Sequence, residues 1–363
     1  MPLSVLGYQS EETNSKSKCH GEEASSVPSN ILIESSEIYT QLPSAENQRT
    51  TVEPSPSNVA ILTIPRPPPT GILAFRPPKA AIFAVQHIRR MRGGAQSHLM
   101  RCSDGNCYVV KFSNNPQDLR VLANEMFAAH LAEATGLPVA DTEVIEVGEW
   151  LVSHTPELNI QLENITIPCN AGLQFGSRYA VSPLEGQVWD RLPALKLARV
   201  RNLPTFVGML AMDKWTGNSD GRQAAFWRKM TQRRYTAAFI DQGNCFNAGD
   251  WDFPDFPLRG TYPQIEVYAR VRGWHSFQPW LSRIETMEES VIWDAAAGIP
   301  PEWYRNDANA LEQLIQVLLE RRPLVRALIA EFRFSTQKPF PNWVEQLQSE
   351  TAPTARSQKQ LVG

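Results

Sequence analysis

The segment LRVLANEMFAAHLAEATGLP, residues 119–138, constrains the fold most strongly, because it predicts one long helix inside a region that otherwise predicts strands. Leu122, Met126 and Ala129 share one face at helical spacing, and a Gly-Leu-Pro sequence ends the helix. Around it, AIFAVQHIRRM, SHLMRCSDGNCYVVKF and DTEVIEVGEWLVSH predict strands around turns, the last of them a strand pair about a glycine. This order predicts a small lobe built on a sheet.

From about residue 190 the pattern becomes mainly helical. LPTFVGMLAMDKWTGN predicts a buried helix that leads into a loop, and RRYTAAFIDQG predicts a strand. DANALEQLIQVLLERRPLVRALIAEF predicts a pair of helices interrupted near Pro323. We therefore expect an α+β, bilobed fold, with a β-rich N-lobe at residues 81–190 and a mainly helical C-lobe at residues 191–345.

The first 80 residues differ in composition from the rest. They are rich in Ser, Glu, Asn, Thr and Pro, and such a segment cannot bury enough apolar surface to offset the entropy of ordering it. We expect a disordered N-terminal arm at residues 1–80, whose proline-rich end is better explained as a linker than as a docking segment. Residues 346–363 are expected to form a flexible tail.

Charge and cysteine content limit the partners and the location. The net charge of −3 gives no reason to expect nucleic acid as a partner. No apolar run reaches roughly 18 residues, and the N-terminus lacks a basic head followed by an apolar block, so neither a membrane span nor a secretory signal is expected. The five cysteines are scattered and odd in number, which favours a reducing cytoplasm.

Two isolated aspartates follow apolar elements in the second half of the chain. Asp220 lies in GNSDGRQAAFW, where an aspartate between glycines is commonly a turn residue but can also serve as a base facing a hydroxyl. Asp241 comes directly after the apolar strand AAFI. Since bare burial of a carboxylate costs several kcal/mol, we expect Asp241 to be paired, capped or metal-bound.

A lysine and a glutamate in the first half form a second candidate pair. Lys111 ends the apolar strand CYVVKF, where a lysine is ordinarily an edge residue reaching water. Glu125 lies on the predicted helix beside its apolar stripe and can turn toward the sheet to pair with Lys111.

The loop RRMRGGAQSH joins two predicted strands and is a candidate phosphate cradle. Its glycines let the backbone approach an anion and its polar side chains add donors, although such a turn is most often a plain hairpin loop. The candidates are Gly93, Gly94, Gln96 and Ser97. The basic runs RRMR and RKMTQRR could also attract phosphates, with solvated surface as the ordinary alternative.

With the glycine loop, the lysine, the glutamate and the two aspartates in this order along the chain, residues 85–335 resemble the HipA-like kinase family. That family is related to protein and phosphoinositide kinases. The resemblance is carried by GGAQSH, NCYVVKFSNNPQ, LANEMFAAHLAEATGLPV, MDKWTGNSDGRQ, FIDQGNCF and IPPEWYRNDANALEQLIQVLLERR. It implies a protein-kinase-like fold with ATP and Mg²⁺ (or Mn²⁺) between the lobes. It also implies roles: phosphate-binding lysine for Lys111, its partner for Glu125, catalytic aspartate for Asp220 and magnesium aspartate for Asp241.

The catalytic loop departs from the family pattern. Members usually carry an asparagine five residues after the catalytic aspartate, whereas position 225 is alanine here. Gln223 or Asn218 could supply the missing amide oxygen to the metal. The loop then belongs either to an active variant or to a pseudokinase that still binds nucleotide, and the first is favoured because the other charged groups remain.

The expected function is transfer of the γ-phosphate of ATP to a hydroxyl. The resemblance implies a protein Ser/Thr acceptor, including autophosphorylation on a loop serine such as Ser97. A small-molecule kinase and a pseudokinase acting as an interaction module are the alternatives. The loop GNCFNAGDWDFPDFPLRGTYP is expected to set acceptor choice, and its acids could recruit a basic acceptor or be ordinary turn residues. The acceptor is not identified, and a regulatory partner protein is a further expectation.

Overall fold

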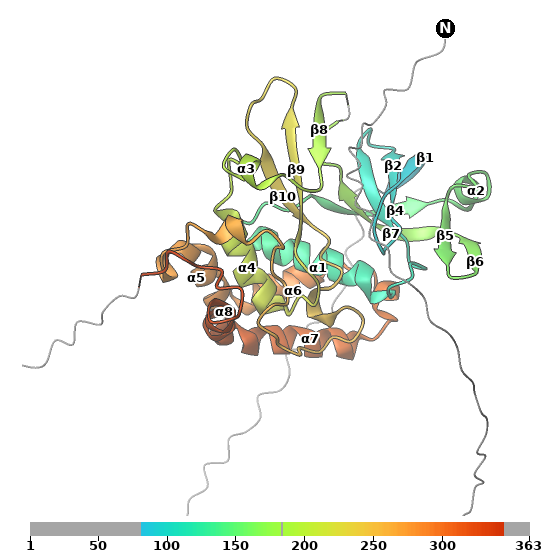
Figure 1. The fold of residues 1–363 in the computed structure, drawn as a ribbon. Helices are drawn as coiled ribbons and strands as arrows, with labels where there is room; N and C mark the ends of the chain where they lie inside the picture. The colour runs from blue at the N-terminus through green and yellow to red at the C-terminus, as the bar shows by residue number, and fades with distance from the viewer. Residues whose placement is uncertain (1–80, 183, 345–363) are drawn as a thin grey trace, which may run out of the picture. The chain divides into compact units, whose positions relative to one another are not determined.

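The computed structural model describes residues 81–182 and 184–344. The predicted arm at residues 1–80 and the predicted tail at residues 346–363 lie outside the described residues. Five strands close into a barrel in the order β1-β2-β3-β7-β4 (Figure 1). They are β1 (Ile82–Arg90), β2 (His98–Cys102), β3 (Cys107–Lys111), β4 (Thr142–Val147) and β7 (Gly172–Arg178). All neighbours pair antiparallel except β1 and β4, which are parallel.

The helix predicted from the opening segment is α1 (Arg120–Ala134), and it is buried on nearly every side rather than on one stripe. It packs against β4 and β7 of the barrel and also against α4 (Thr205–Thr216) and α6 (Glu289–Ala296). A helix between two packed layers must bury its polar residues too, and Asn124 and Glu125 are both buried. The fold therefore directs these two side chains inward.

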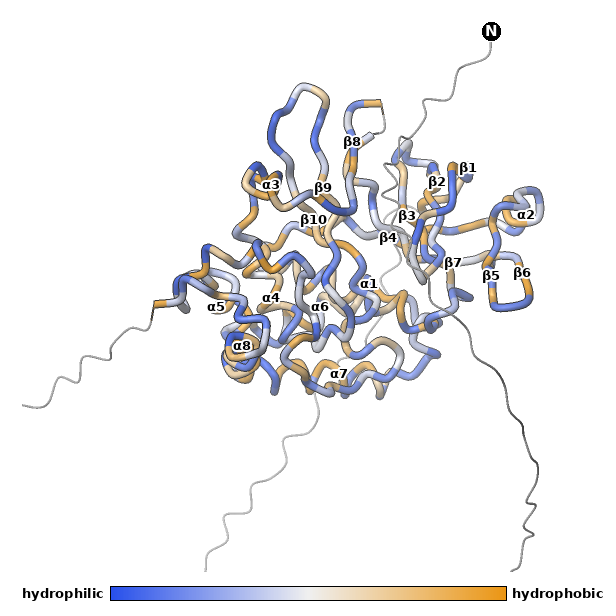
Figure 2. The backbone as a smooth tube through the Cα atoms, in the orientation of Figure 1, coloured by the Kyte–Doolittle hydropathy of each residue, from blue (hydrophilic) through white to orange (hydrophobic). Residues whose placement is uncertain are grey.

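The second half of the described chain is mainly helical. Besides α4 and α6, its helices are α3 (Ala194–Leu197), α5 (Trp280–Glu285), α7 (Ala308–Arg321) and α8 (Val325–Arg333). The short 3-10 segment η5 (Arg322–Leu324) separates α7 from α8, as the proline predicts. Along α7 hydrophilic and hydrophobic residues alternate (Figure 2), and its apolar side joins the larger of two hydrophobic cores. The predicted helix pair is confirmed.

A three-stranded sheet carries the loops of interest. Its order is β10-β9-β8, from β8 (Gly186–Trp189), β9 (Gln223–Lys229) and β10 (Thr236–Ile240). A separate hairpin of β5 (Asn159–Leu162) and β6 (Ile165–Pro168) extends from the barrel. The predicted α+β fold, β-rich first and helical second, is confirmed, while the exact lobe boundary at residue 190 stays a prediction.

The strand pair predicted about Gly148 is wrong in its second half. β4 is followed by the short helix α2 (Glu149–Ser153), and Gly148 is the residue that precedes its first turn. Glu149 lies in that first turn, where a negative charge is favourable. Within the described residues, no helix is both long and apolar enough to cross a membrane.

Candidate active site

Lys111 joins the barrel to the rest of the site. It is the last residue of β3, opposite Phe175 of β7, and its side chain is almost completely buried. Its Nζ donates to Oε1 of Glu125 on α1 and, at 2.6 Å, to Oδ1 of Asp241 after β10. A strand, the helix that follows it and a loop 130 residues further along the chain thus meet at one ammonium group.

Glu125 also holds the loop that carries Asp241. Its Oε2 accepts from the backbone N–H of Gln242 at 3.0 Å, and its Oε1 accepts from that of Gly243 at 2.9 Å. A Cβ on Gly243 would lie 2.6 Å from Cγ1 of Val121, so only glycine fits this close approach to α1. Asp241 itself has φ +63°, a left-handed conformation that is rare outside glycine and occurs preferentially at functional sites.

Burial and neighbouring charges shift the pKa values in this cluster in opposite directions, and the charges have the larger effect for Lys111 and Asp241. Burial would lower the pKa of Lys111, but the carboxylates of Glu125 and Asp241 raise it well above its usual value. Burial would likewise raise the pKa of Asp241, but Lys111 holds it below its usual value. Lys111 and Asp241 are therefore both charged near neutral pH.

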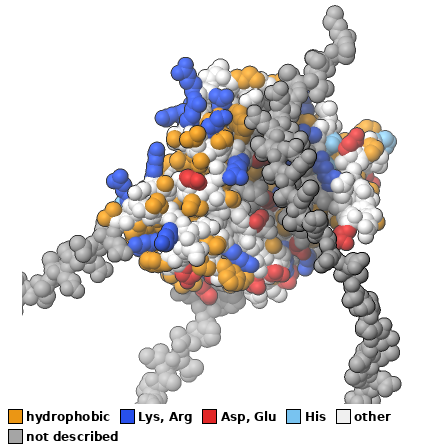
Figure 3. Space-filling model, in the orientation of Figure 1, with side chains coloured by type: hydrophobic (Ala, Val, Ile, Leu, Met, Phe, Trp, Pro, Cys, Tyr) orange, Lys and Arg blue, Asp and Glu red, His pale blue; other side chains and the backbone are white. Residues whose placement is uncertain are grey.

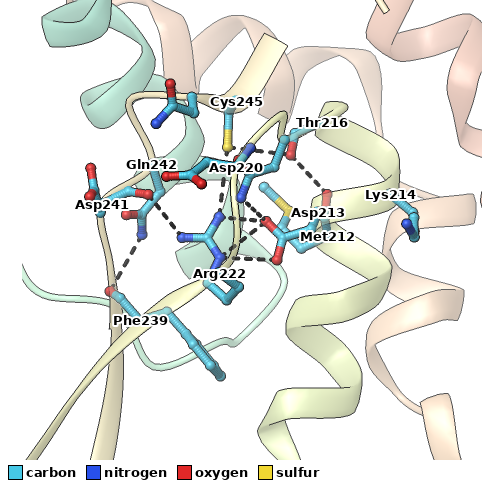
Figure 4. A network of polar contacts seen from close by, with 12 residues as sticks. Met212, Asp213, Lys214, Thr216, Asp220, Arg222, Phe239, Asp241, Gln242 and Cys245 are labelled. Atoms are coloured by element: carbon cyan, nitrogen blue, oxygen red, sulfur yellow. Dashed lines mark hydrogen bonds and ion pairs between the residues drawn. The ribbon is translucent and has the colours of Figure 1, made fainter. Parts of the chain in front are cut away.

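Asp220 lies in the loop between α4 and β9, beside the loop of Asp241. The backbone N–H and the hydroxyl of Ser219 both donate to the carbonyl of Asn244, at 2.9 and 3.2 Å, which ties the two loops together. Gly221 N–H donates to Oδ1 of Asp220 at 2.7 Å. Figure 4 shows Asp220 and Asp241 on the loops around Arg222.

The two candidate amide ligands have different surroundings. Gln223 begins β9 opposite Ile240, is exposed, and its Nε2 lies 2.5 Å from Oδ2 of Asp241. Asn218 is buried; its Nδ2 donates to Asp213 at 3.0 Å and its Oδ1 accepts from Asp220 N–H at 3.1 Å. Both metal assignments stay predictions, but only Gln223 touches Asp241 directly.

The position of the missing asparagine lies inside a strand. Ala225 is buried in β9 and pairs with Ala238 of β10. Gln223, two residues earlier in the same strand, is the residue that contacts Asp241. Position 225 therefore lies one strand repeat further into the sheet than the residue that touches Asp241.

The glycine loop lies at the Lys111 end of the barrel. His98 pairs with Val110, so Ser97, one residue earlier, lies beside Lys111. Gly93 has φ +123°, which favours glycine. The amide of Gln96 donates to the carbonyl of Gln161 at 2.7 Å and accepts from its N–H at 2.8 Å. Gln96 thus holds β5 in this structure, and the phosphate-cradle role of the loop stays a prediction.

An ion pair that the sequence interpretation missed supports the Asp220 loop. Arg222 and Asp213 of α4 are both buried, with Arg222 Nε 3.0 Å from Asp213 Oδ2 (Figure 4). Arg222 Nη1 also donates to the carbonyls of Ile240 and Asp241, at 2.9 and 3.2 Å. The available signal was an aspartate inside a mainly apolar helix, nine residues before an arginine.

The loop expected to set acceptor choice uses its acids internally. Both carboxylate oxygens of Asp255 accept from Arg321 of α7, at 2.7 and 2.8 Å. Asp252 accepts from Asn247 at 2.6 Å. Lys214 of α4 donates to the carbonyls of Pro257 and Arg259 at 2.8 and 2.6 Å, which fixes the same loop. Asp255 therefore has its charge balanced within the chain.

Comparison with known proteins gives one family and several solved structures. The family model described as HipA-like kinase matches residues 84–248. No significant match is found among curated proteins.

Three of the similar solved structures are two kinases and a toxin–antitoxin complex by their descriptions. The Helicobacter pylori proinflammatory kinase CtkA has 14% identity and TM-score 0.39, covering 65% of this chain and 93% of that one. HipA of Shewanella oneidensis MR-1, solved with HipB and operator DNA, has 12% identity and TM-score 0.41, covering 73% and 76%. A Golgi casein kinase with Mn/ADP bound has 13% identity and TM-score 0.40, covering 73% and 75%.

The family match spans both Lys111 and Asp241, which meet in the structure. The resemblance found from the sequence is therefore confirmed, because residues 84–248 match the model of the HipA-like kinase family.

Proposed function

We propose that this protein is an ATP-dependent kinase that transfers the γ-phosphate to a hydroxyl. The observation that carries this proposal is the contact of Lys111 with both Glu125 and Asp241. Phosphoryl transfer is catalysed mainly by positioning and by positive charge at the phosphates, so it needs a fixed lysine beside a metal-binding carboxylate. An ordinary edge lysine would lie in solvent instead.

Each side chain of the site has its own role in this proposal. Lys111, held by Glu125, would bind phosphate oxygens as a fixed positive charge. Asp220 would accept the proton of the acceptor hydroxyl, since it lies on the loop tied to the Asp241 loop. Arg222 would keep both loops in place through Asp213 and the carbonyl of Asp241.

The residues present suit a Mg²⁺ or Mn²⁺ ion. Such ions take oxygen ligands, commonly one or two carboxylates together with phosphates and water. The described residues hold no group of three or more His, Cys, Asp or Glu side chains placed to bind a metal alone. Asp241 with the amide of Gln223 would supply the protein ligands, and the ion would supply charge stabilisation.

The acceptor proposed is a serine or threonine of a protein. Autophosphorylation at Ser97 requires that the loop move first, because Ser97 is only 7% exposed. A cytoplasmic location belongs to the same proposal, supported by the four described cysteines, which are all free thiols.

The test is incubation of the purified protein with γ-labelled ATP and Mg²⁺ or Mn²⁺, followed by mass spectrometry of the phosphorylated sites. We expect wild type to incorporate label, and Asp220→Ala and Asp241→Ala to lose it. The exposed Asp190→Ala serves as a matched control and should retain it. Equal incorporation by wild type and Asp241→Ala would refute the assignment.

The variant loop supports a second candidate, a pseudokinase that binds nucleotide without transferring phosphate. The observation in its favour is Ala225, which is buried in a strand where the family pattern has a metal-binding asparagine. Stabilisation by Mg²⁺ and ATP in a thermal-shift assay, without any label transferred to protein or small molecule, would select this candidate.

A further inference from the structure

A cavity lies beside the Asp220 loop. Its volume is about 530 Å³, and it is lined by Arg191, Pro193, Ala194, Pro263, Gln264 and Glu266. Cγ of Pro263 lies 3.8 Å from the position of a Cβ on Gly221, the residue after Asp220. Arg222 N–H donates to the carbonyl of Thr261 at 3.0 Å, so the cavity wall and the Asp220 loop are bonded to each other.

Positive charge continues outward from this cavity. Figure 3 shows Lys and Arg side chains gathered where α3 and the β9–β10 hairpin lie, with hydrophobic side chains between them. We call this the basic surface; its exposed members are Lys196, Arg199, Arg201, Lys229, Arg233 and Arg234. Residues 191–201 and 228–235 contain eight Lys and Arg and no Asp or Glu, although the whole chain has a net charge of −3. Lys229 forms an ion pair with Glu185 at 3.3 Å, and the remaining positive charge is a local concentration.

Backbone bonds hold the two basic segments together. Arg201 N–H donates to the carbonyl of Tyr235 at 2.9 Å, and Tyr235 N–H donates to the carbonyl of Arg199 at 3.1 Å. The guanidinium of Arg228 lies over the rings of Trp189 and Tyr235, at 5.5 and 5.3 Å, and so packs the hairpin against β8. The basic surface thus has a fixed framework that begins at the cavity.

We propose that the basic surface and the cavity bind the acceptor protein through a segment rich in acidic residues that flanks the phosphorylated hydroxyl. This inference rests on the proposed kinase function for its catalytic part. Fixed positive charge favours a partner of opposite charge and speeds its association. The segment would run from the cavity beside Asp220 over α3 to the hairpin.

The apolar lining favours a peptide over a nucleic acid. Pro193, Ala194 and Pro263 line the cavity and offer contacts to apolar side chains, which a phosphate backbone lacks. Leu195, on α3 within the basic surface, is 94% exposed and offers an apolar contact to a peptide side chain. The mixture of apolar and positive groups suits a segment that combines acidic and apolar residues.

The test measures binding without nucleotide, so that it does not depend on catalysis. Labelled peptides with a central serine, flanked by glutamates in one and by lysines in the other, are titrated with the full-length protein and followed by fluorescence anisotropy. Lys196→Glu/Arg199→Glu reverses two charges of the basic surface, and Arg101→Glu/Arg272→Glu reverses two exposed charges elsewhere as the control. All four side chains are exposed, so unfolding curves should match wild type.

We expect the glutamate peptide to bind at least about tenfold tighter than the lysine peptide, and less tightly when NaCl rises from about 50 to about 300 mM. Lys196→Glu/Arg199→Glu should weaken it about tenfold, and the control less than about twofold. Equal affinity for both peptides, or equal loss in both variants, would overturn the proposal. Tighter binding of a single-stranded oligonucleotide than of the glutamate peptide would assign the surface to nucleic acid instead.

The two proposals can fail separately. If the glutamate peptide binds but no phosphate is transferred, the proposed kinase function is wrong and the proposed binding surface is not. If transfer does occur, the glutamate peptide should have the higher kcat/KM, and Lys196→Glu/Arg199→Glu should remove that preference without removing transfer to the lysine peptide.

Discussion

The Arg222–Asp213 pair and the Lys111–Asp241 pair combine the same kinds of charge but differ in their access to solvent. Both side chains of the first pair are buried, and the arginine donates hydrogen bonds to Asp213 and to the carbonyls of residues 240 and 241. In the second pair the lysine is buried, while the side chain of Asp241 is 25% exposed and touches the exposed Gln223. The first pair, which we call the closed pair, has no access to solvent. The second, which we call the open pair, is accessible to solvent on the side of Asp241.

The difference separates a pair that holds the backbone from a pair that can take a ligand. A buried charge pair without access to solvent offers nothing to a substrate, but breaking it leaves an uncompensated charge. A half-open pair with an unusual pKa is a candidate functional site. Arg222 connects the two, because it binds the carbonyl of Asp241 itself.

The largest effect is expected from breaking the closed pair. Asp213→Asn leaves the guanidinium of Arg222 buried without a negative partner, so we expect the free energy of unfolding to fall by about 3–5 kcal/mol. Urea denaturation followed by circular dichroism measures this loss. The exposed Asp190→Asn should change it by less than about 0.5 kcal/mol. A loss for Asp213→Asn as small as that control would mean that the pair does not hold the loops.

Removing the lysine of the open pair should lower the free energy of unfolding less than breaking the closed pair does, but it should weaken ATP binding. Lys111→Met keeps the apolar stem. The partly exposed Asp241 can be hydrated, and the buried Glu125 keeps its two backbone N–H donors and can take up a proton, so we expect a loss of about 1–2 kcal/mol. ATP binding measured by calorimetry should weaken at least about tenfold, the value of a lost contact to a charged group. Unchanged ATP affinity in a folded Lys111→Met protein would show that this lysine only stabilises the barrel.

The pH dependence of stability should also distinguish the open pair. The pKa of Asp241 is lowered on folding, so its contribution is complete above its unfolded value of about 3.9 and is lost as pH falls through the folded value. The stability difference between wild type and Asp241→Asn should therefore shrink between about pH 5 and pH 3. Urea titrations across this range measure it, and a difference that stays constant contradicts the assignment.

The smallest stability effect is expected at Gln223, although its effect on metal use should be clear. Gln223→Ala removes an exposed side chain, so stability should change by less than about 0.5 kcal/mol. If the amide assists Asp241 at the metal, the Mg²⁺ concentration for half-maximal phosphate transfer should rise about three- to tenfold. Gln187→Ala on β8 is a matched exposed control. Identical Mg²⁺ curves for both variants would remove Gln223 from the metal site.

Much of the fold follows from local patterns in the sequence. The strands around the glycine loop, α1, α4 and the interrupted pair α7 and α8 all carry periodic apolar residues and clear end signals. The alternation in DTEVIEVGEWLVSH predicts a second strand after Gly148, yet the chain forms the helix α2 there. A five-residue segment carries too little periodicity to distinguish the two forms.

The site was predictable only in part, since its contacts join distant residues. The contact of Lys111 with Glu125 could be anticipated because a strand end and the next helix are neighbours in the chain. The placement of Asp241 between Lys111 and Gln223, and the support of both loops by Arg222, depend on the pairing of β9 with β10. Gln96 likewise bonds to Gln161, which lies 65 residues away. No local pattern specifies such contacts.

The most direct test of the account is the shift of the unfolding temperature produced by Mg²⁺ and ATP in Asp241→Asn and in wild type. If the open pair takes the metal-bound nucleotide, wild type should gain stability as the logarithm of ligand concentration, and Asp241→Asn should gain almost none in Mg²⁺ while remaining folded. An equal rise in both proteins would contradict the claim that Asp241 and Lys111 form the nucleotide site.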